Sequence, residues 1–286
     1  MVSLTVSCVV DARAVVGEGP IWDVAQQVLW WTDIKGRIVH RFDPATGADR
    51  AFGMPIRVGC MALRRNGGFV LAAEHGFWFW WPQEDRLEHI VDVEAGRPDN
   101  RMNDGACDRQ GRFVVSSMNL APDKQPSAAC WRLDTSLRVV QLAEGLTIGN
   151  GIAFSPAGDR FYLADTQARR VWQHRYSADG ELGERMDFLD TAGLAGKPDG
   201  ATVDAEGFYW LAGVYGGQLY RIAPDGRIDR SIDLPISTPT CARFGGKDMA
   251  DLYVTSMGES LPGPAGGLFV VRGLGVRGLP EPLFGG

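Results

Sequence analysis

The chain lacks the features that mark several large classes of protein. None of its apolar runs approaches the roughly 18 residues of a membrane-spanning helix. Residues 1–10 have no basic segment and alternate in hydropathy, which indicates a strand rather than a signal peptide. Lys and Arg number 29 against 35 Asp and Glu, and this acidic balance argues against nucleic acid as a partner. The absences favour a cytoplasmic protein that binds neither membrane nor nucleic acid.

Cysteine is scarce and forms no metal-binding pattern. The five cysteines are widely spread and contain no C-x-x-C pair, so we expect reduced, mostly buried thiols. The four histidines show no H-E-x-x-H spacing, and neither a G-x-S-x-G elbow nor a Walker loop is present. Serine hydrolases and nucleotide-binding enzymes therefore have no support.

Glycine and aromatic residues are abundant, and they belong to a repeat. The chain has 37 glycines, 9 Trp and 13 Phe among 286 residues. Six β-rich runs begin near residues 28, 69, 113, 161, 209 and 252, and each is followed by a second strand-like run. The mean period of about 45 residues is typical of propeller blades with four short strands. We predict an all-β, six-bladed β-propeller that forms one domain over residues 1–286, with residues 4–10 adding a strand to the last blade.

One position of the repeat is polar in four of the six units. In the third, fourth and fifth units, the residue eight positions before the turn glycine is Asn103, Asn150 or Asp199. The first unit lacks this glycine, but the residue five positions before Asp23 is Glu18. The second and sixth units carry no charge here. Because this position precedes the strand that lines the propeller axis, the four side chains are expected to converge there.

Two carboxylates that meet on a dry axis repel each other unless a cation lies between them. Carboxylate and amide oxygens are hard ligands that suit Ca²⁺, Mg²⁺ or Mn²⁺, although carboxylates also accept Zn²⁺ and Fe²⁺. A few protein ligands on one side of an ion leave coordination positions open for water and substrate, as in catalytic sites. The repeat therefore predicts a central metal site.

These segments resemble the SMP-30/gluconolactonase/regucalcin-like family. The resemblance is carried by residues 17–22 (GEGPIW), 101–105 (RMNDG), 149–156 (GNGIAFSP), 198–204 (PDGATVD) and 239–246 (PTCARFGG). It implies one divalent cation, Ca²⁺ first and Zn²⁺, Mn²⁺, Mg²⁺ or Fe²⁺ as alternatives, held by Glu18, Asn150 and Asp199. It also implies hydrolysis of a sugar lactone, a glucono- or pentonolactone, with Arg101 and Asn103 contacting substrate oxygens.

The resemblance is incomplete in the loop after the second strand of the third blade, residues 118–126. Members of the family often carry an acidic residue there. In this chain the register of the loop is open: Asp123 is the candidate substitute, or no acid takes the place. The loop is polar and contains two prolines, which leaves a lid and a plain surface loop as equal possibilities.

A mechanism follows for this candidate site. Water must attack the lactone carbonyl while negative charge grows on its oxygen, and a bound cation would stabilise that charge. We expect Asp199 to act as both ligand and general base, and Glu18 to act mainly as a charge-balancing ligand. Two alternatives stay open. One is an organophosphate or ester hydrolase with the same metal, and the other is a calcium-binding or protein-interaction propeller without catalysis.

Overall fold

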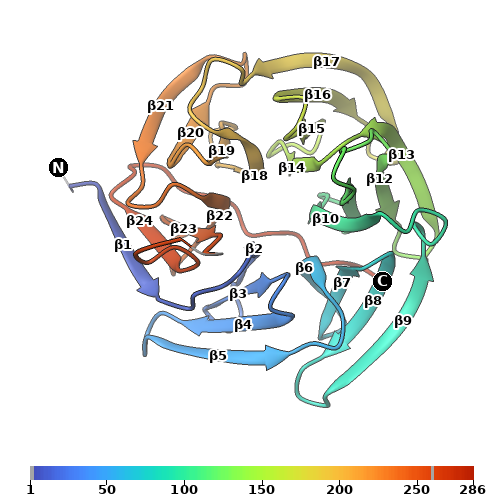
Figure 1. Cartoon of the computed structure of the whole chain (residues 1–286), viewed down its shortest axis with the longest axis horizontal. Helices are drawn as coiled ribbons and strands as arrows, with labels where there is room; N and C mark the ends of the chain where they lie inside the picture. The colour runs from blue at the N-terminus through green and yellow to red at the C-terminus, as the bar shows by residue number, and fades with distance from the viewer. Residues whose placement is uncertain (1–2, 259–260) are drawn as a thin grey trace.

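A computed structural model describes residues 3–258 and 261–286, so residues 1–2 and 259–260 of the expected domain lie outside it. Within the described residues, 24 strands form six four-stranded antiparallel sheets arranged in a ring (Figure 1). This confirms the six-bladed β-propeller that the repeat predicts. No helix in the described ranges is long and apolar enough to cross a membrane.

The four strands of each sheet follow one another outward from the centre of the ring. The inner strands are β2 (Gly17–Asp23), β6 (Val58–Leu63), β10 (Asn100–Cys107), β14 (Gly149–Phe154), β18 (Lys197–Val203) and β22 (Pro239–Gly245). The second strands are β3 (Val28–Asp33), β7 (Phe69–Ala73), β11 (Phe113–Asn119), β15 (Arg160–Asp165), β19 (Tyr209–Val214) and β23 (Asp251–Ser256). The third strands are β4 (Ile38–Asp43), β8 (Gly76–Trp81), β12 (Ala128–Leu133), β16 (Arg170–Tyr176), β20 (Gln218–Ile222) and β24 (Leu268–Arg272). The outer strands are β5 (Ala48–Gly53), β9 (Arg86–Asp92), β13 (Val139–Leu146), β17 (Leu182–Asp190), β21 (Ile228–Asp233) and β1 (Thr5–Val10).

The N-terminal strand closes the ring. β1 pairs antiparallel with β24, with Thr5 opposite Arg272, and so becomes the outer strand of the last sheet. The first and last parts of the chain therefore share one blade, as the sequence predicts for residues 4–10. This arrangement ties the ends of the ring together through backbone hydrogen bonds.

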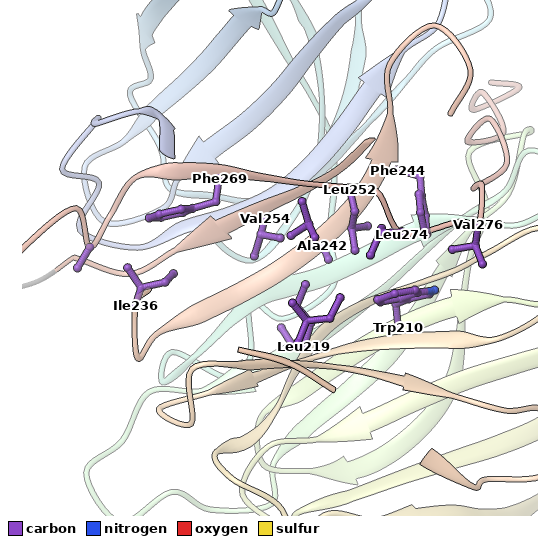
Figure 2. Packing of buried hydrophobic residues seen from close by; sticks show 14 residues of the cluster. Trp210, Leu219, Ile236, Ala242, Phe244, Leu252, Val254, Phe269, Leu274 and Val276 are labelled. Atoms are coloured by element: carbon purple, nitrogen blue, oxygen red, sulfur yellow. The ribbon is translucent and has the colours of Figure 1, made fainter. Parts of the chain in front are cut away.

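The core consists of apolar clusters between neighbouring sheets. Figure 2 shows the cluster between the last two blades, in which Trp210 and Phe244 meet edge to face with ring centroids 5.8 Å apart. Both side chains are almost fully buried, and side chains of this size supply most of the hydrophobic stabilisation between blades. The cysteines are all free thiols, four of them buried, as predicted.

The chain after β24 crosses the ring near its centre and ends beside β7 (Figure 1). Backbone hydrogen bonds attach it to three other blades, from Ala205 N to Arg277 O, from Phe284 N to Leu63 O and from Gly285 N to Gly111 O. This C-terminal segment, residues 277–286, lies at the end of the axis where the inner strands turn into the second strands.

Candidate active site

Every inner strand carries a β-bulge at or beside the position that the repeat singles out. The bulges lie between Glu18 and Ile21, Val58 and Cys60, Met102 and Gly105, Asn150 and Ala153, Pro198 and Ala201, and Pro239 and Ala242. A bulge puts one extra residue into a strand and re-aims the local side chains. Six equivalent bulges around one axis bring the predicted polar residues to the same depth.

Glycine follows three of these polar residues, and at two of the three glycines the backbone is left-handed. Gly19 has a φ of 52° and Gly151 a φ of 62°, values that residues with a Cβ rarely adopt. A Cβ on Gly151 would also lie 2.3 Å from the Tyr209 hydroxyl oxygen. That hydroxyl donates a hydrogen bond to the carbonyl oxygen of Gly151 at 2.7 Å. The neighbouring blade thus fixes the turn that presents Asn150.

The five predicted site residues line one cavity of about 280 Å³, and each is less than one tenth exposed: Glu18, Arg101, Asn103, Asn150 and Asp199. They come from four inner strands, β2, β10, β14 and β18. Much of the remaining wall is apolar, which strengthens electrostatic interactions inside the cavity. The convergence expected from the repeat is therefore present.

A chain of hydrogen bonds connects the polar residues across the cavity floor. Nη1 of Arg101 donates to Oδ1 of Asn103 at 2.8 Å, and Nδ2 of Asn103 donates to Oδ1 of Asn150 at 3.0 Å. Nδ2 of Asn150 then donates to Oγ1 of Thr166 at 2.8 Å. Both amide atoms of Asn103 thus have protein partners. Its geometry suits the positioning of Asn150, a role that the sequence did not suggest.

The two carboxylates in the cavity accept few hydrogen bonds: Oε2 of Glu18 accepts one from the backbone N–H of Gly19 at 3.0 Å, and Asp199 interacts with the side-chain amide of Asn150. Burial, reinforced by the charge of Asp104, raises the pKa of Glu18 to about 8. Burial also raises the pKa of Asp199 well above its usual range, with Glu18 and Asp104 adding to the rise and the amide of Asn150 opposing it. A positive charge between these groups would favour their ionised forms.

Glu18, Asn150 and Asp199 fit a divalent cation by the chemistry of their donor atoms. They offer two carboxylates and an amide oxygen, and the pKa of both acids stays raised although the charge of Arg101 opposes the rise. No group of three or more His, Cys, Asp or Glu residues that could hold a metal occurs in the described ranges. A set with only two acids and one amide is compatible with that finding.

Residues 16–258 match the family described as SMP-30/Gluconolactonase/LRE-like region. The chain belongs to this family. It is 35% identical to a 6-deoxy-6-sulfogluconolactonase from Pseudomonas putida over 99% of both chains. It is 33% identical to pentonolactonase XacC from Haloferax volcanii over 92% of this chain and 89% of that one. The crystal structure of a calcium-binding protein, regucalcin, from Agrobacterium tumefaciens superposes with a TM-score of 0.91 at 28% identity, covering 97% and 96% of the two chains.

Within this SMP-30/gluconolactonase fold, sequence reasoning missed three charged residues near the axis. Asp104 is buried, accepts a hydrogen bond from the backbone N–H of Ile152 at 2.8 Å and raises the pKa of both cavity acids. Lys124 and Lys197 line the cavity beside the predicted residues. A signal for Asp104 was its place beside Asn103 in the bulge. The two lysines lie outside the repeated position, so the repeat could not indicate them.

Proposed function

We propose that this protein hydrolyses a sugar lactone to the aldonic acid with the help of one divalent cation held by Glu18, Asn150 and Asp199. The main support for the proposal is that two buried carboxylates with raised pKa values and an amide oxygen lie in one cavity. The relatives named as sulfogluconolactonase and pentonolactonase support lactones as the substrate class. A cytoplasmic location remains the expectation from the sequence.

A lactone is a cyclic ester, and its hydrolysis requires a nucleophilic water and stabilisation of the carbonyl oxygen. The cation, when bound, would polarise that oxygen and lower the pKa of nearby water. Asp199 would take the proton from the attacking water, because a cation bound beside it would keep its carboxylate ionised. Asn103 holds Asn150 through its 3.0 Å hydrogen bond, and Glu18 balances charge.

Arg101 is placed to bind the substrate. Its two hydrogen bonds to protein acceptors within the described ranges, Met102 O and Asn103 Oδ1, both use Nη1. Nε and Nη2 are therefore the atoms we assign to ring or hydroxyl oxygens, because the planar guanidinium presents them in a fixed fork. Burial lowers the pKa of Arg101 to about 10, so the group stays charged near neutral pH.

The test is a continuous assay of acid release from a panel of glucono- and pentonolactones. The chelated protein is assayed alone and after addition of Ca²⁺, Zn²⁺, Mn²⁺, Mg²⁺ or Fe²⁺. We expect turnover that depends on one of these ions and falls at least roughly 100-fold in Glu18→Gln. Glu84→Gln, at an exposed turn carboxylate, is the matched control and should leave the rate unchanged.

Three results would overturn the proposal. Lactone opening that persists after chelation removes the role of the cation. Tight binding of an ion without turnover of any lactone favours the calcium-binding propeller. Turnover of organophosphates or simple esters in preference to every lactone favours the alternative hydrolase.

A further inference from the structure

The loop after β11, residues 120–127, brings a lysine to the cavity. Lys124 lines the cavity, whereas the loop's acid, Asp123, is exposed and accepts a hydrogen bond from Nε2 of Gln125 at 2.7 Å. The loop thus presents a cationic side chain to the cavity, where Asp123 was the candidate acid. The charge that meets the substrate at this side of the cavity is opposite to the one the family resemblance implies.

The fold of the loop holds Lys124 in place. Oδ1 of Asn119 accepts hydrogen bonds from the backbone N–H groups of Ala121 and Gln125, at 3.1 and 3.3 Å. Lys124 itself has a φ of 45°, an uncommon conformation for a residue with a Cβ, and its Nζ donates to Asn119 O at 3.0 Å. Strained backbone at a ligand-facing position persists where the surrounding contacts determine it. These contacts fix the ammonium group over the cavity.

Two more cations line the same cavity, one from another blade and one from the blade that carries Lys124. Lys197 lies two residues before Asp199 on β18, and its Nζ donates to Oε1 of Gln167 at 3.3 Å. Arg101 contributes its guanidinium from β10, and partial burial together with the charge of Arg101 lowers the pKa of Lys124. The three cations therefore come from two blades, the third and the fifth. The two lysines are less buried than Glu18 and Asp199, which places them nearer the opening.

The balance of charge in the cavity is positive. Its charged lining consists of three cations and the two carboxylates Glu18 and Asp199. The cations outnumber the carboxylates, and a divalent cation bound by the carboxylates would add to the positive charge. Ammonium groups only donate hydrogen bonds, so they leave the hydroxyl protons of a neutral sugar without an acceptor. An oxyanion supplies both a counter-charge and hydrogen-bond acceptors for the two lysines.

We propose that the lactone carries an anionic substituent, a sulfonate or a phosphate, which Lys124 and Lys197 bind at the end of the cavity opposite the carbonyl. This inference rests on the proposed lactonase function and narrows it to acidic sugar lactones. The lysines are substrate-recognition residues and take no part in the bond that breaks.

The first test compares kcat/KM for D-glucono-1,5-lactone with that for its 6-deoxy-6-sulfo and 6-phospho counterparts. We expect the charged lactones to be favoured at least roughly tenfold, the effect of one good charged contact. Lys124→Met and Lys197→Met should each lower kcat/KM for the charged lactones about tenfold, mainly through KM, and leave the neutral lactone within about twofold. The ratio between sulfonate and phosphate identifies which oxyanion fits. Lys247→Met, at an exposed turn lysine, is the matched control.

A second test measures binding without turnover. Titration calorimetry with gluconate and with 6-phosphogluconate should give tighter binding of the latter by roughly tenfold. The difference should vanish in the Lys124→Met/Lys197→Met variant and shrink with added salt, because the contacts lie near the opening. Thermal unfolding of the variant should match that of the wild type, since both side chains are partly exposed.

The outcomes separate this inference from the function on which it rests. Equal kcat/KM for neutral and charged lactones, with no effect of the lysine variants, overturns the inference and leaves the lactonase proposal intact. A fall of kcat for the neutral lactone as large as that for the charged ones also overturns it, because the lysines would then serve the reaction itself. Absence of all lactone turnover, together with preferential binding of 6-phosphogluconate, overturns the function and keeps the anion site.

Discussion

Asp199 and Asp204 lie five residues apart, at the two ends of one inner strand, and their surroundings differ. Asp204 is fully buried, and its Oδ2 accepts hydrogen bonds from Nε1 of Trp210 at 2.9 Å and Nε of Arg221 at 2.8 Å. Two backbone N–H groups donate to its Oδ1 at 3.0 Å. Asp199 forms no ion pair with an arginine among the described residues; burial and the charge of Glu18 raise its pKa, and the charge of Arg101 only partly opposes that rise.

Some buried acids of a propeller stabilise its fold, whereas others are suited to binding a ligand. A buried carboxylate with a full set of donors is compensated and fixes the local fold. In a buried carboxylate without such donors, the negative charge is poorly stabilised, so the group takes up a proton or binds a cation. In the first blade the two ends differ less, because Asp23 accepts the backbone N–H of Gln26 at 2.9 Å and Glu18 accepts that of Gly19 at 3.0 Å. In the fifth blade, the turn end of the inner strand is thus structural, and the cavity end is chemical.

Identical substitutions at the two aspartates should therefore have opposite effects. We expect Asp199→Asn to lower kcat for lactone opening by roughly 10³-fold, because a cation ligand and the general base are lost together. Its free energy of unfolding, measured by denaturant titration, should stay equal or rise, since a poorly compensated buried charge is removed.

Asp204→Asn should instead lower the free energy of unfolding by about 3 kcal/mol, because Arg221 loses its buried counter-charge. The folded fraction should retain its kcat, since Asp204 is at the far end of the strand. A loss of stability in Asp199→Asn equal to that in Asp204→Asn would contradict the division between the two ends.

The raised pKa of Glu18 should make the free energy of unfolding depend on pH. The pKa of Glu18 is about 8 in the folded protein, against 4.5 for a free glutamate. Between these values the folded protein holds a proton that the unfolded chain has released, so the free energy of unfolding falls as pH rises through this window. Raised pKa values at Asp199 act in the same direction.

The measurement is denaturant unfolding of chelated protein at pH values from 5 to 9, with Glu18→Gln as the comparison. We expect the variant to lose less stability than the wild type across the window, and an excess of the activating cation to remove much of the difference. Parallel curves for the two proteins would mean that Glu18 is ionised at all these pH values. Burial would then not raise the pKa of Glu18 in the folded protein.

The fold and the converging residues could be predicted from the sequence because both recur with the period of the repeat. Six similar runs indicated the blades, the eight-residue spacing from the turn glycine indicated Asp199, and the five-residue spacing from Asp23 indicated Glu18. The sequence did not indicate which acids of each inner strand have hydrogen-bond donors beside them. Arg221, the partner of Asp204, comes from β20, and its approach depends on how the third strand packs. Lys124 belongs to a loop that occurs once, so no symmetry located it.

The C-terminal segment extends the comparison to the two ends of the propeller axis. At the cavity end, Lys124 and Lys197 surround an opening. At the other end, Nη1 of buried Arg243 pairs with Oε1 of Glu281 at 2.7 Å, and the remaining voids are only about 10 Å³ each. The segment therefore closes this end of the axis, and we expect ligands to enter the cavity from the other end.

Glu281→Gln tests this closure and should have the smallest effect. The side chain of Glu281 is 21% exposed, so water partly replaces the lost charge, and we expect a loss of about 1–2 kcal/mol in the free energy of unfolding. Glu206→Gln, which removes an exposed partner of buried Arg221, is the matched control and should cost less than about 1 kcal/mol. Lactone turnover should be unchanged in both, because neither residue lines the cavity. A marked fall in kcat for Glu281→Gln alone would mean that the closed end of the axis also positions the catalytic groups.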